Sequence, residues 1–376
     1  MPIDRFPGRL AVQQRVLPNY RAPFFDLLAS ACDGGMSLFT GLPRPEEGIT
    51  STSELRSTKY RLGNNIHLFR GPLYLCYQRG LIHWLRDWDP EALIVEANPR
   101  YLSTSSAVKW MHARGRKVIG WGLGSPPPSS SPRFLPPTGM LREKWGERQR
   151  EAFLKQFDAL ITYSQRGADE YAALGFPQTK IFVAHNSVSP QPAFPNPKRP
   201  STFDLPPCVL FVGRLQARKR VDDLLRACAQ MPLSPRLMIV GDGPERASLE
   251  SLAKQVYPSA EFIGAKYGAE LKPYFTEADL FVLPGTGGLA VQEAMSYGLP
   301  VIVAKGDGTQ DDMVREGNGW QIPPDDLDAL VTTMKNALSD AAHLRKMGDE
   351  SYRIVKEEIN IEKMAEVFVR ALNSLS

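Results

Sequence analysis

The sequence predicts an α/β protein with two domains, each built on a doubly wound parallel sheet of the Rossmann type, and a cleft between them. In both halves of the 376 residues, short apolar runs of strand composition alternate with helical patterns, as expected for parallel sheets that are covered by helices. Residues 189–207 hold seven prolines, so this stretch is expected to be the interdomain linker. A chain of this length suits two domains of ordinary size.

We expect the first domain over residues 1–188 and the second over 208–360. In a fold of this kind, the final helix at 361–375 crosses back to the first domain. Apolar runs predict strands in the first domain at 9–15, 35–40, 66–69, 92–96, 117–122, 159–164 and 180–184. In the second domain they predict strands at 208–213, 237–240, 261–264, 280–283 and 301–304. A Pro/Ser-rich loop at 124–139 follows a strand, which places it at the expected ligand crevice.

Composition indicates a globular protein of the cytoplasm. Hydrophobic residues make up 43% of the chain and charged residues 23%, which are ordinary values. No apolar run reaches the roughly 20 residues that span a bilayer, and the N-terminal residues lack the apolar core of a signal peptide. The four cysteines have no C-x-x-C spacing, so the sequence indicates neither a zinc site nor a disulfide framework.

The two halves differ in charge. Residues 1–206 contain 26 Lys and Arg against 17 Asp and Glu, a net charge of +9, whereas residues 207–376 have a net charge of −5. A basic first domain suggests an anionic surface or acceptor, although chance composition is an equal alternative. The helix expected over 79–88, which is basic and contains Trp, could rest on an anionic membrane or simply pack on a sheet. No nucleic-acid-binding motif accompanies the charge, so nucleic acid is not expected as a partner.

The most informative stretch is 280–304. It predicts a strand, a tight loop, a helix over 289–297, a turn and a second strand, with Thr286 as the helix cap. In a parallel sheet, the amide groups at such a helix start point to the ligand crevice and favour anions. Glu293 is expected about two turns into the helix, at a depth that suits the hydroxyl groups of a ribose. The alternative is an ordinary βαβ unit with a solvated Glu293.

These residues carry a resemblance. Pro284 to Ile302 resembles the donor-binding signature of the retaining glycosyltransferases of family 4, with matches at nine positions: Pro284, Gly288, Leu289, Glu293, Ala294, Gly298, Pro300, Val301 and Ile302. The resemblance implies the GT-B arrangement of two Rossmann-like domains that face a central cleft. The chain departs from the family at Gly285, where relatives have the first Glu of an E-x7-E pair that reaches the donor sugar.

The start of the second domain carries a second match. Gly213, Arg214 and Lys219 resemble the family's G-R-x-x-x-x-K motif, which implies that both cations neutralise the donor diphosphate. Two cations after a buried strand suit a departing diphosphate, although a solvated basic loop is the alternative. Residues 264–266 stand where the family holds the nucleobase. The resemblance thus implies a donor site of twelve residues: Gly213, Arg214, Lys219, Gly264, Ala265, Lys266, Gly285, Thr286, Gly287, Gly288, Leu289 and Glu293.

The first domain is expected to hold the acceptor. Its candidate residues lie after or at the ends of expected strands: Asn19, Tyr20, Arg21, Asn98 and Trp121. Asn19, Tyr20 and Arg21 stand where many family members have a glycine-rich loop, and they could equally just close the loop. The His that many members carry after the strand at 92–96 has no counterpart, because Glu96 and Asn98 occupy that neighbourhood.

The sequence therefore predicts a glycosyltransferase that uses a nucleotide-diphospho-sugar, with a UDP-sugar expected, and a glycan or lipid-linked acceptor. Arg214, Lys219 and Glu293 are the expected catalytic residues. The resemblance implies retention of anomeric configuration, no cofactor and no essential metal. Peripheral contact with the inner face of the cell membrane is a further expectation. Two alternatives stay open: a nucleotide-sugar epimerase of the same fold, and a non-catalytic protein that binds nucleotide sugars or glycans.

Overall fold

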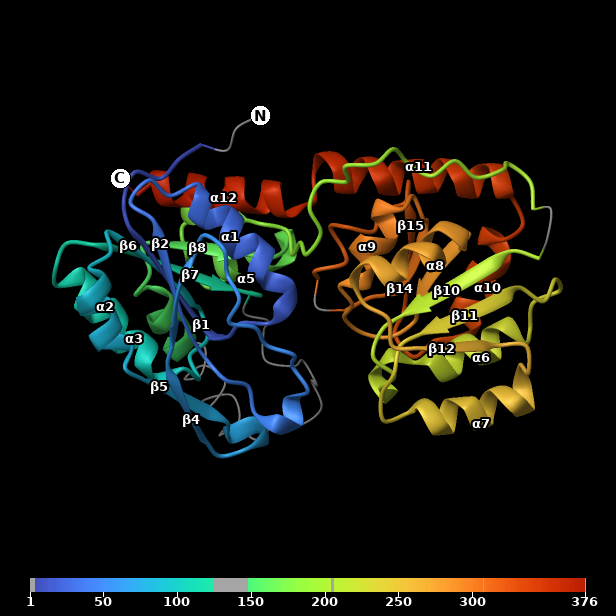
Figure 1. Cartoon of the computed structure of the whole chain (residues 1–376), viewed down its shortest axis with the longest axis horizontal. Helices are drawn as coiled ribbons and strands as arrows, with labels where there is room; N and C mark the ends of the chain where they lie inside the picture. Colours follow the sequence, from blue (N-terminus) through green and yellow to red (C-terminus); the bar gives the residue numbers. More distant parts are fainter. Residues whose placement is uncertain (1–3, 125–147, 204–205, 307, 376) are drawn as a thin grey trace. The chain divides into compact units, whose positions relative to one another are not determined.

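A computed structural model describes residues 4–124, 148–203, 206–306 and 308–375. The chain divides into two compact units (Figure 1). Unit 1 comprises residues 1–188 and 361–376, and unit 2 comprises residues 189–360. Each unit is a parallel sheet with helices packed on it, which confirms the predicted α/β class. Most of the Pro/Ser-rich loop expected at 124–139 lies outside the described residues.

Unit 1 is built on a seven-stranded parallel sheet in the order β3-β2-β1-β6-β7-β8-β9. Its strands are β1 Leu10–Val16, β2 Met36–Gly41, β3 Lys59–Leu62, β6 Ala92–Glu96, β7 Lys117–Gly122, β8 Ala159–Thr162 and β9 Ile181–Val183. Every residue of β2 and β8 is buried, so these strands read as continuous apolar or small-residue runs.

The strand predicted at 66–69 is not part of this sheet. Residues Asn64–Leu68 form β4, which pairs in antiparallel fashion with β5 Leu75–Arg79 as a separate hairpin. The third strand of the sheet is instead β3, whose residues are mostly exposed. An edge strand with polar side chains lacks the apolar run on which the prediction relied.

The helices of unit 1 are α1 Ala22–Ser30, α2 Leu81–Trp88, α3 Leu102–His112, α5 Gln165–Ala173 and α12 Ile361–Asn373, with a further helical segment at 148–154. Short 3-10 turns lie at Asn19–Arg21, Pro45–Glu47, Gly71–Leu73 and Gln178–Lys180. The last helix, α12, packs against α1 (Figure 1). Its Phe368 inserts between Phe24 and Trp121, with ring centroids 5.0 and 4.8 Å away.

Unit 2 is a six-stranded sheet in the order β12-β11-β10-β13-β14-β15, and all its pairs are parallel. The strands are β10 Cys208–Val212, β11 Arg236–Val240, β12 Glu261–Gly264, β13 Leu280–Leu283, β14 Val301–Ala304 and β15 Gly319–Ile322. The helices are α6 Val221–Cys228, α7 Arg246–Val256, α8 Lys272–Glu277, α9 Ala290–Ser296, α10 Leu327–Ala337 and α11 Ala341–Glu357. Short 3-10 turns lie at Ala217–Lys219 and Gly268–Leu271.

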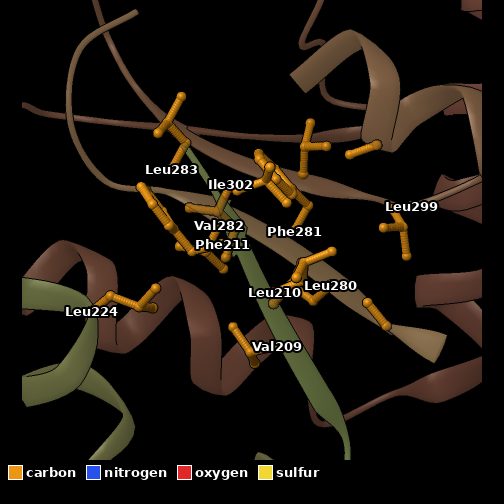
Figure 2. Packing of buried hydrophobic residues seen from close by; sticks show 14 of the residues in the cluster. Val209, Leu210, Phe211, Leu224, Leu280, Phe281, Val282, Leu283, Leu299 and Ile302 are labelled. Atoms are coloured by element: carbon orange, nitrogen blue, oxygen red, sulfur yellow. The ribbon is translucent and has the colours of Figure 1, made fainter. Parts of the chain in front are cut away.

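The core of unit 2 is centred on β10 and β13. Figure 2 shows Leu210 and Phe211 of β10 packed with Phe281 of β13 and with Ile302 of β14. These side chains are completely buried, and each contributes about 1.5–3 kcal/mol relative to an exposed side chain. The core therefore holds rigid the two strands whose following loops form the candidate site.

The proline-rich stretch 189–207 belongs to unit 2 and is bonded to it. Arg199 donates hydrogen bonds of 2.8 to 3.4 Å to backbone carbonyls of five residues, Phe275, Thr276, Ala278, Tyr297 and Gly298. Arg345 of α11 donates to the Pro200 carbonyl at 2.8 Å and also pairs with Asp279 at 2.6 Å. A segment without regular structure is thereby attached to the ends of α8 and α9.

We predict that Arg199→Met destabilises unit 2. The substitution removes a guanidinium that satisfies several carbonyl groups at once, and the expected loss in the free energy of unfolding is about 2–4 kcal/mol. Burial and the nearby Arg345 lower the pKa of Arg199 to about 10, so the group stays charged at neutral pH. Urea unfolding followed by circular dichroism measures the change. The control is Lys198→Met at the exposed neighbouring position, and an equal loss in both variants would contradict the assigned role.

Candidate active site

The candidate site of unit 2 lies where the strand order of its sheet reverses. The chain runs from β10 outward through β11 and β12, and then returns to the other side of β10 at β13. Ligands of doubly wound folds bind at the carboxyl ends of the strands at such a point. Two loops leave the sheet there, residues 213–219 after β10 and residues 284–289 after β13. They contain eight of the predicted donor-site residues.

Lys219 connects these two loops. Its side chain is buried, with 6% exposed, and Nζ donates to the carbonyl of Thr286 at 2.8 Å and to the carbonyl of Gly287. The Thr286 amide returns a hydrogen bond of 3.0 Å to the carbonyl of Arg218. The structure thus brings together residues that are nearly seventy positions apart in the sequence.

The ammonium group of Lys219 lies in an unfavourable electrostatic environment. Burial and the neighbouring Arg218 guanidinium lower its pKa to about 8, because both disfavour the protonated form. Neutral carbonyl groups are its partners here, and they offset the charge only partly. An anion placed beside Nζ would stabilise the ammonium group much more than these carbonyls do.

Gly285 is the point of closest approach between the loops. A Cβ atom on this residue would lie 2.1 Å from the Arg218 carbonyl oxygen and 2.5 Å from the Lys219 Cα. Both contacts are with backbone, so a side chain requires the loops to separate. This is a steric reason for glycine where the family signature has a glutamate. Gly287 also requires glycine, because its φ is +64°.

The remaining glycines permit close packing of neighbouring loops. The Gly213 amide donates to the Val240 carbonyl at 3.0 Å, and the Gly241 amide donates to the Gly264 carbonyl at 2.9 Å. A Cβ on Gly241 would lie 1.9 Å from the Gly213 oxygen, and one on Gly243 would lie 2.2 Å from the Leu215 oxygen. The loops after β10, β11 and β12 therefore form one continuous backbone surface at the carboxyl edge.

Glu293 lies in α9, the helix that follows the loop 284–289. The side chain is partly buried, and burial raises the pKa of its carboxyl group to about 7. Desolvation is the cause of this shift, and no cation among the described residues contributes to it. A carboxyl group in such a position can accept hydrogen bonds from ligand hydroxyl groups, which replace the lost water.

The start of this helix differs from the prediction. The helix α9 begins at Ala290, its first flanking residue is Leu289, and Thr286 is an exposed loop residue that does not cap it. Glu293 consequently lies in the first turn and not about two turns further in. The hydrogen bonds between Thr286 and the loop 213–219 keep Thr286 out of helical geometry. Because these bonds join residues far apart in the sequence, the local sequence pattern could not reveal them.

Other predicted donor residues lie at the same carboxyl edge. Arg214 is exposed directly after Gly213, and Ala265 is exposed directly after β12. Lys266 lies 3.8 Å from Glu270 across their charged groups. The structure therefore brings Lys219, Gly285, Thr286 and Gly287 into direct contact, whereas Gly264 is linked to the loop after β11 by the hydrogen bond from the Gly241 amide.

Two residues of this region were not predicted. Arg218 Nη1 donates to the Thr286 carbonyl at 3.3 Å. In the sequence, the position of Arg218 beside Lys219 was the feature that could have indicated this role. Gln292 is 1% exposed, and its amide accepts from Ser189 N at 3.2 Å and donates to the Ile359 carbonyl at 2.7 Å. Ser189 and Ile359 lie at the two ends of unit 2, so no local pattern could identify Gln292.

Unit 1 has a corresponding reversal between β1 and β6. Glu96 at the end of β6 accepts a hydrogen bond of 2.6 Å from the Arg15 amide of β1, and Arg15 Nη1 pairs with Glu47 at 2.9 Å. Burial raises the pKa of Glu96 to about 7, although the Arg15 amide and charge oppose the shift. A partly neutral carboxyl group thus lies at the ligand-binding edge of this sheet.

Three predicted acceptor residues remain accessible to a ligand. Asn19 lines a cavity of about 650 Å³ between the start of α1 and residues 52–56. Tyr20 is 44% exposed. Asn98 is partly buried, and its side-chain oxygen accepts from the Arg100 amide at 3.0 Å, so it also shapes the turn after β6.

Two predicted acceptor residues are buried instead. Trp121 is 2% exposed, and it packs in the core of unit 1 against Phe368. Arg21 is 6% exposed, and it donates to the Ser187 carbonyl at 3.0 Å and to the side chain of Asn186. Their polar or aromatic surfaces are already covered by unit 1 in this structure, and a direct contact of either with an acceptor stays a prediction.

Within the described ranges, no group of three or more His, Cys, Asp or Glu side chains is placed to hold a metal ion. Two Asp-x-Asp triplets occur in the sequence. In Asp87-Trp88-Asp89, the last carboxylate pairs with Arg116 at 2.6 Å. In Asp326-Leu327-Asp328, the first carboxylate caps α10 by accepting from the Ala329 amide. Both triplets therefore serve local structure at helix ends.

Comparisons with known proteins agree with this geometry. Residues 195–354 match the family model described as "Glycosyl transferases group 1". The chain is 40% identical over 142 residues to a GDP-mannose-dependent alpha-mannosyltransferase of Mycobacterium tuberculosis, and 36% identical over 140 residues to the sulfoquinovosyl transferase SQD2 of Arabidopsis thaliana. These matches cover 37% and 36% of this chain, but only 34% and 27% of the two relatives.

The solved structure of Anabaena Alr3699/HepE in complex with UDP has the same fold. It superposes with a TM-score of 0.68 at 15% sequence identity, and the match covers 97% of this chain and 99% of that chain. At this identity the likeness concerns the fold alone. Residues 195–354 thus match the glycosyl transferases group 1 model, within a chain that shares the α/β fold of this solved structure.

Proposed function

We propose that the protein is a glycosyltransferase of the family 4 type that moves a hexosyl group from a nucleotide-diphospho-sugar to a glycan or lipid-linked acceptor. The expected donor is a UDP-sugar, and the anomeric configuration is retained. The observation that carries the proposal is the buried ammonium group of Lys219, held between two loops at the carboxyl edge of a glycosyl transferases group 1 domain.

The chemistry requires stabilisation of a leaving diphosphate. As the bond between the sugar and the diphosphate breaks, negative charge grows on the phosphate oxygens. Lys219 and Arg214 supply positive charge at that position without a bound metal, so neither a metal nor another cofactor is required. Lys219 is already fixed by the loop carbonyls, so little reorganisation accompanies bond cleavage. The Glu293 carboxylate accepts hydrogen bonds from the ribose hydroxyl groups, and the amide groups of Gly287 and Gly288 lie close to the sugar.

The identities of base and sugar need a direct comparison of donors. One relative is named for GDP-mannose, whereas a structural neighbour is a complex with UDP. Incubation with matched panels of UDP- and GDP-sugars, followed by detection of free nucleoside diphosphate, separates the two bases. Slow donor hydrolysis supports transfer, an isomerised sugar nucleotide would indicate an epimerase, and binding without turnover would indicate a binding protein.

The acceptor is assigned to unit 1. Asn19, Tyr20 and Asn98 are its accessible candidates, and the net charge of +9 over residues 1–206 suits an anionic acceptor. The protein is proposed to act in the cytoplasm, at the inner face of the cell membrane. No helix within the described ranges has both the length and the apolar character needed to cross a bilayer.

The double variant Arg214→Ala/Lys219→Ala should lose most donor binding and turnover. Each charge-assisted contact is worth about 1.5–3 kcal/mol, so the affinity for UDP should fall at least about tenfold in calorimetry. The control is Arg226→Ala/Lys254→Ala, which removes two exposed cations of unit 2. Full affinity and activity of the first variant would place the diphosphate elsewhere.

The same site predicts a pH dependence. Because the pKa of Lys219 is about 8, the affinity for UDP should fall as the pH rises through about 8 and the ammonium group loses its proton. Lys219→Arg keeps a permanent charge, so any UDP binding that this variant retains should lack the decline. A parallel decline in both proteins would assign the pH dependence to another group.

Glu293→Gln should have opposite effects on binding and on stability. Loss of the carboxylate should weaken UDP binding by about 1–3 kcal/mol. The folded-state pKa of Glu293, about 7, lies above the usual 4.5. The contribution of its protonated form to the stability of the wild type is therefore lost as the pH rises from 4.5 through 7. Glutamine does not titrate. The free energy of unfolding of the variant, relative to that of the wild type, should therefore be higher at pH 8 than at pH 4.5 by on the order of 2–3 kcal/mol.

Calorimetry and denaturant unfolding at both pH values measure these two effects. Glu316→Gln, at an exposed carboxylate, serves as the control. Unchanged UDP affinity in the Glu293 variant would reject the ribose role. A gain in stability that is equal at both pH values would reject the buried carboxylate as its cause.

Gly285 tests how the site recognises the sugar. Gly285→Ala should separate the two loops and lower stability by about 1–3 kcal/mol, while Gly317→Ala should be tolerated because the nearest atom to its added Cβ is 3.6 Å away. Thermal unfolding measures both. Gly285→Glu should abolish transfer. If Gly285→Glu instead gains activity on neutral donors, the lack of a carboxylate at position 285 limits the activity of the wild type. A preference of the wild type for acidic sugars would support recognition of the sugar by backbone amides.

A further inference from the structure

The hairpin of unit 1 exposes a cluster of large apolar side chains. Leu62 of β3, Ile66 and Leu68 of β4, Phe69 and Leu73 of the connecting loop, and Tyr77 of β5 are 38% to 73% exposed. We refer to these six residues as the hairpin face. Soluble proteins rarely gather such residues on one hairpin without a partner.

The register of the hairpin explains why Ile66, Leu68 and Tyr77 share one face, next to the exposed Leu62, Phe69 and Leu73. Ile66 pairs with Tyr77 and Leu68 pairs with Leu75 across the two strands. Residues two apart on a strand point to the same side, so the pairs Ile66/Tyr77 and Leu68/Leu75 lie on the outer side. At the tip, Phe69 adopts a positive φ of 60° and is 66% exposed, a costly conformation for an aromatic residue.

The inner side of the same hairpin is bonded to the sheet. Gln78 Nε2 donates to Asn65 at 2.9 Å and to the Gln14 carbonyl at 3.1 Å. Asn65 Nδ2 donates to the Arg15 carbonyl at 2.8 Å, and the Cys76 amide donates to the Arg100 carbonyl at 2.9 Å. Polar contacts therefore hold the hairpin in place, and its apolar residues are not needed for attachment.

The charges of the hairpin segment have one sign, while Glu47, which lies near His67 and Tyr74, is paired with Arg15 and Arg44. Residues 59–79 contain Lys59, Arg61, Arg70 and Arg79, and no Asp or Glu. All four cations are exposed, and Arg70 directly precedes the 3-10 turn Gly71–Leu73 at the tip. Apolar side chains surrounded by cations are complementary to an anionic lipid surface, where rings enter the interface and cations attract the headgroups.

We propose that the hairpin face, with the four surrounding cations, docks the protein on an anionic lipid surface. The helix α2, which the sequence suggested for this role, packs on the sheet, because Leu81, Trp84 and Leu85 are buried. Trp88 donates to the Leu10 carbonyl at 3.0 Å. We therefore assign the contact with lipid to the hairpin face and not to α2. This assignment rests on the proposed function and names the surface of unit 1 that meets the membrane.

Vesicle binding tests the proposal. The full-length protein should co-sediment with phosphatidylcholine vesicles that contain phosphatidylglycerol, and binding should fall at high salt or without the anionic lipid. Phe69→Ser/Leu73→Ser and Arg70→Glu should each weaken partitioning about tenfold or more. The assay contains no nucleotide sugar, so a negative result leaves the transferase proposal untouched.

Matched controls lie in unit 2. Leu233 is 68% exposed and Arg226 is exposed on α6, so Leu233→Ser and Arg226→Glu repeat the chemical changes elsewhere. Both controls should bind vesicles as the wild type does. Circular dichroism and UDP binding of the hairpin variants should be unchanged, because the altered side chains make no core contacts.

A site-specific label identifies the surface directly. The four native cysteines are buried, so an environment-sensitive maleimide dye should react selectively with Phe69→Cys or with the control Leu233→Cys. A blue shift with anionic vesicles at position 69 alone is the expected result. No shift at 69, or equal shifts at both positions, overturns the proposal. A dimer in sedimentation velocity that Phe69→Ser dissolves would also overturn it, since the face would then serve a second copy.

Discussion

The architecture of the candidate donor site depends on one close contact between backbones. The loop after β10 and the loop after β13 touch at Gly285, where a single methyl group would collide with the carbonyl of Arg218. This contact places the carbonyls of Thr286 and Gly287 around the ammonium group of Lys219. The buried core strands hold both loops in place. A charge that would otherwise be solvated is thereby fixed and partly desolvated, which is the state in which it interacts most strongly with an anion.

The same reversal of strand order produces a polar edge in each unit, but the chemistry differs. In unit 2 the edge carries the cations Arg214 and Lys219, together with Glu293, whose carboxyl pKa is raised by burial. In unit 1 the edge holds Arg15 between Glu47 and Glu96. One fold therefore supplies two ligand-binding edges of different charge. This suits a reaction with an anionic leaving group and a hydroxyl-bearing acceptor.

Attachment of peripheral segments follows a common physical pattern. Arg199, Gln292 and Gln78 are each bonded to backbone groups that sheet and helix hydrogen bonding leave unsatisfied. A multivalent donor or a primary amide can satisfy several such groups at low cost, because buried polar groups require partners. Such bonds help to hold the proline-rich segment and the β4–β5 hairpin, and Phe194 and Phe203 of the proline-rich segment also pack on unit 2. Apolar residues on the hairpin are consequently left on the surface.

The sequence by itself determined the α/β class, eleven of the strands in the two sheets and the residues of the donor motifs, because each is encoded by local periodicity or by contiguous spacing. Only the tertiary structure decided the rest. It buried Trp121 and Arg21 in unit 1, moved the start of α9 past Thr286, and identified Arg218 and Gln292. It also showed that Asn64–Leu68 belongs to a hairpin and not to the sheet. These outcomes depend on contacts between residues far apart in the chain, such as Lys219 with Gly287 and Gln292 with Ile359, and no local pattern records which distant group a side chain will meet.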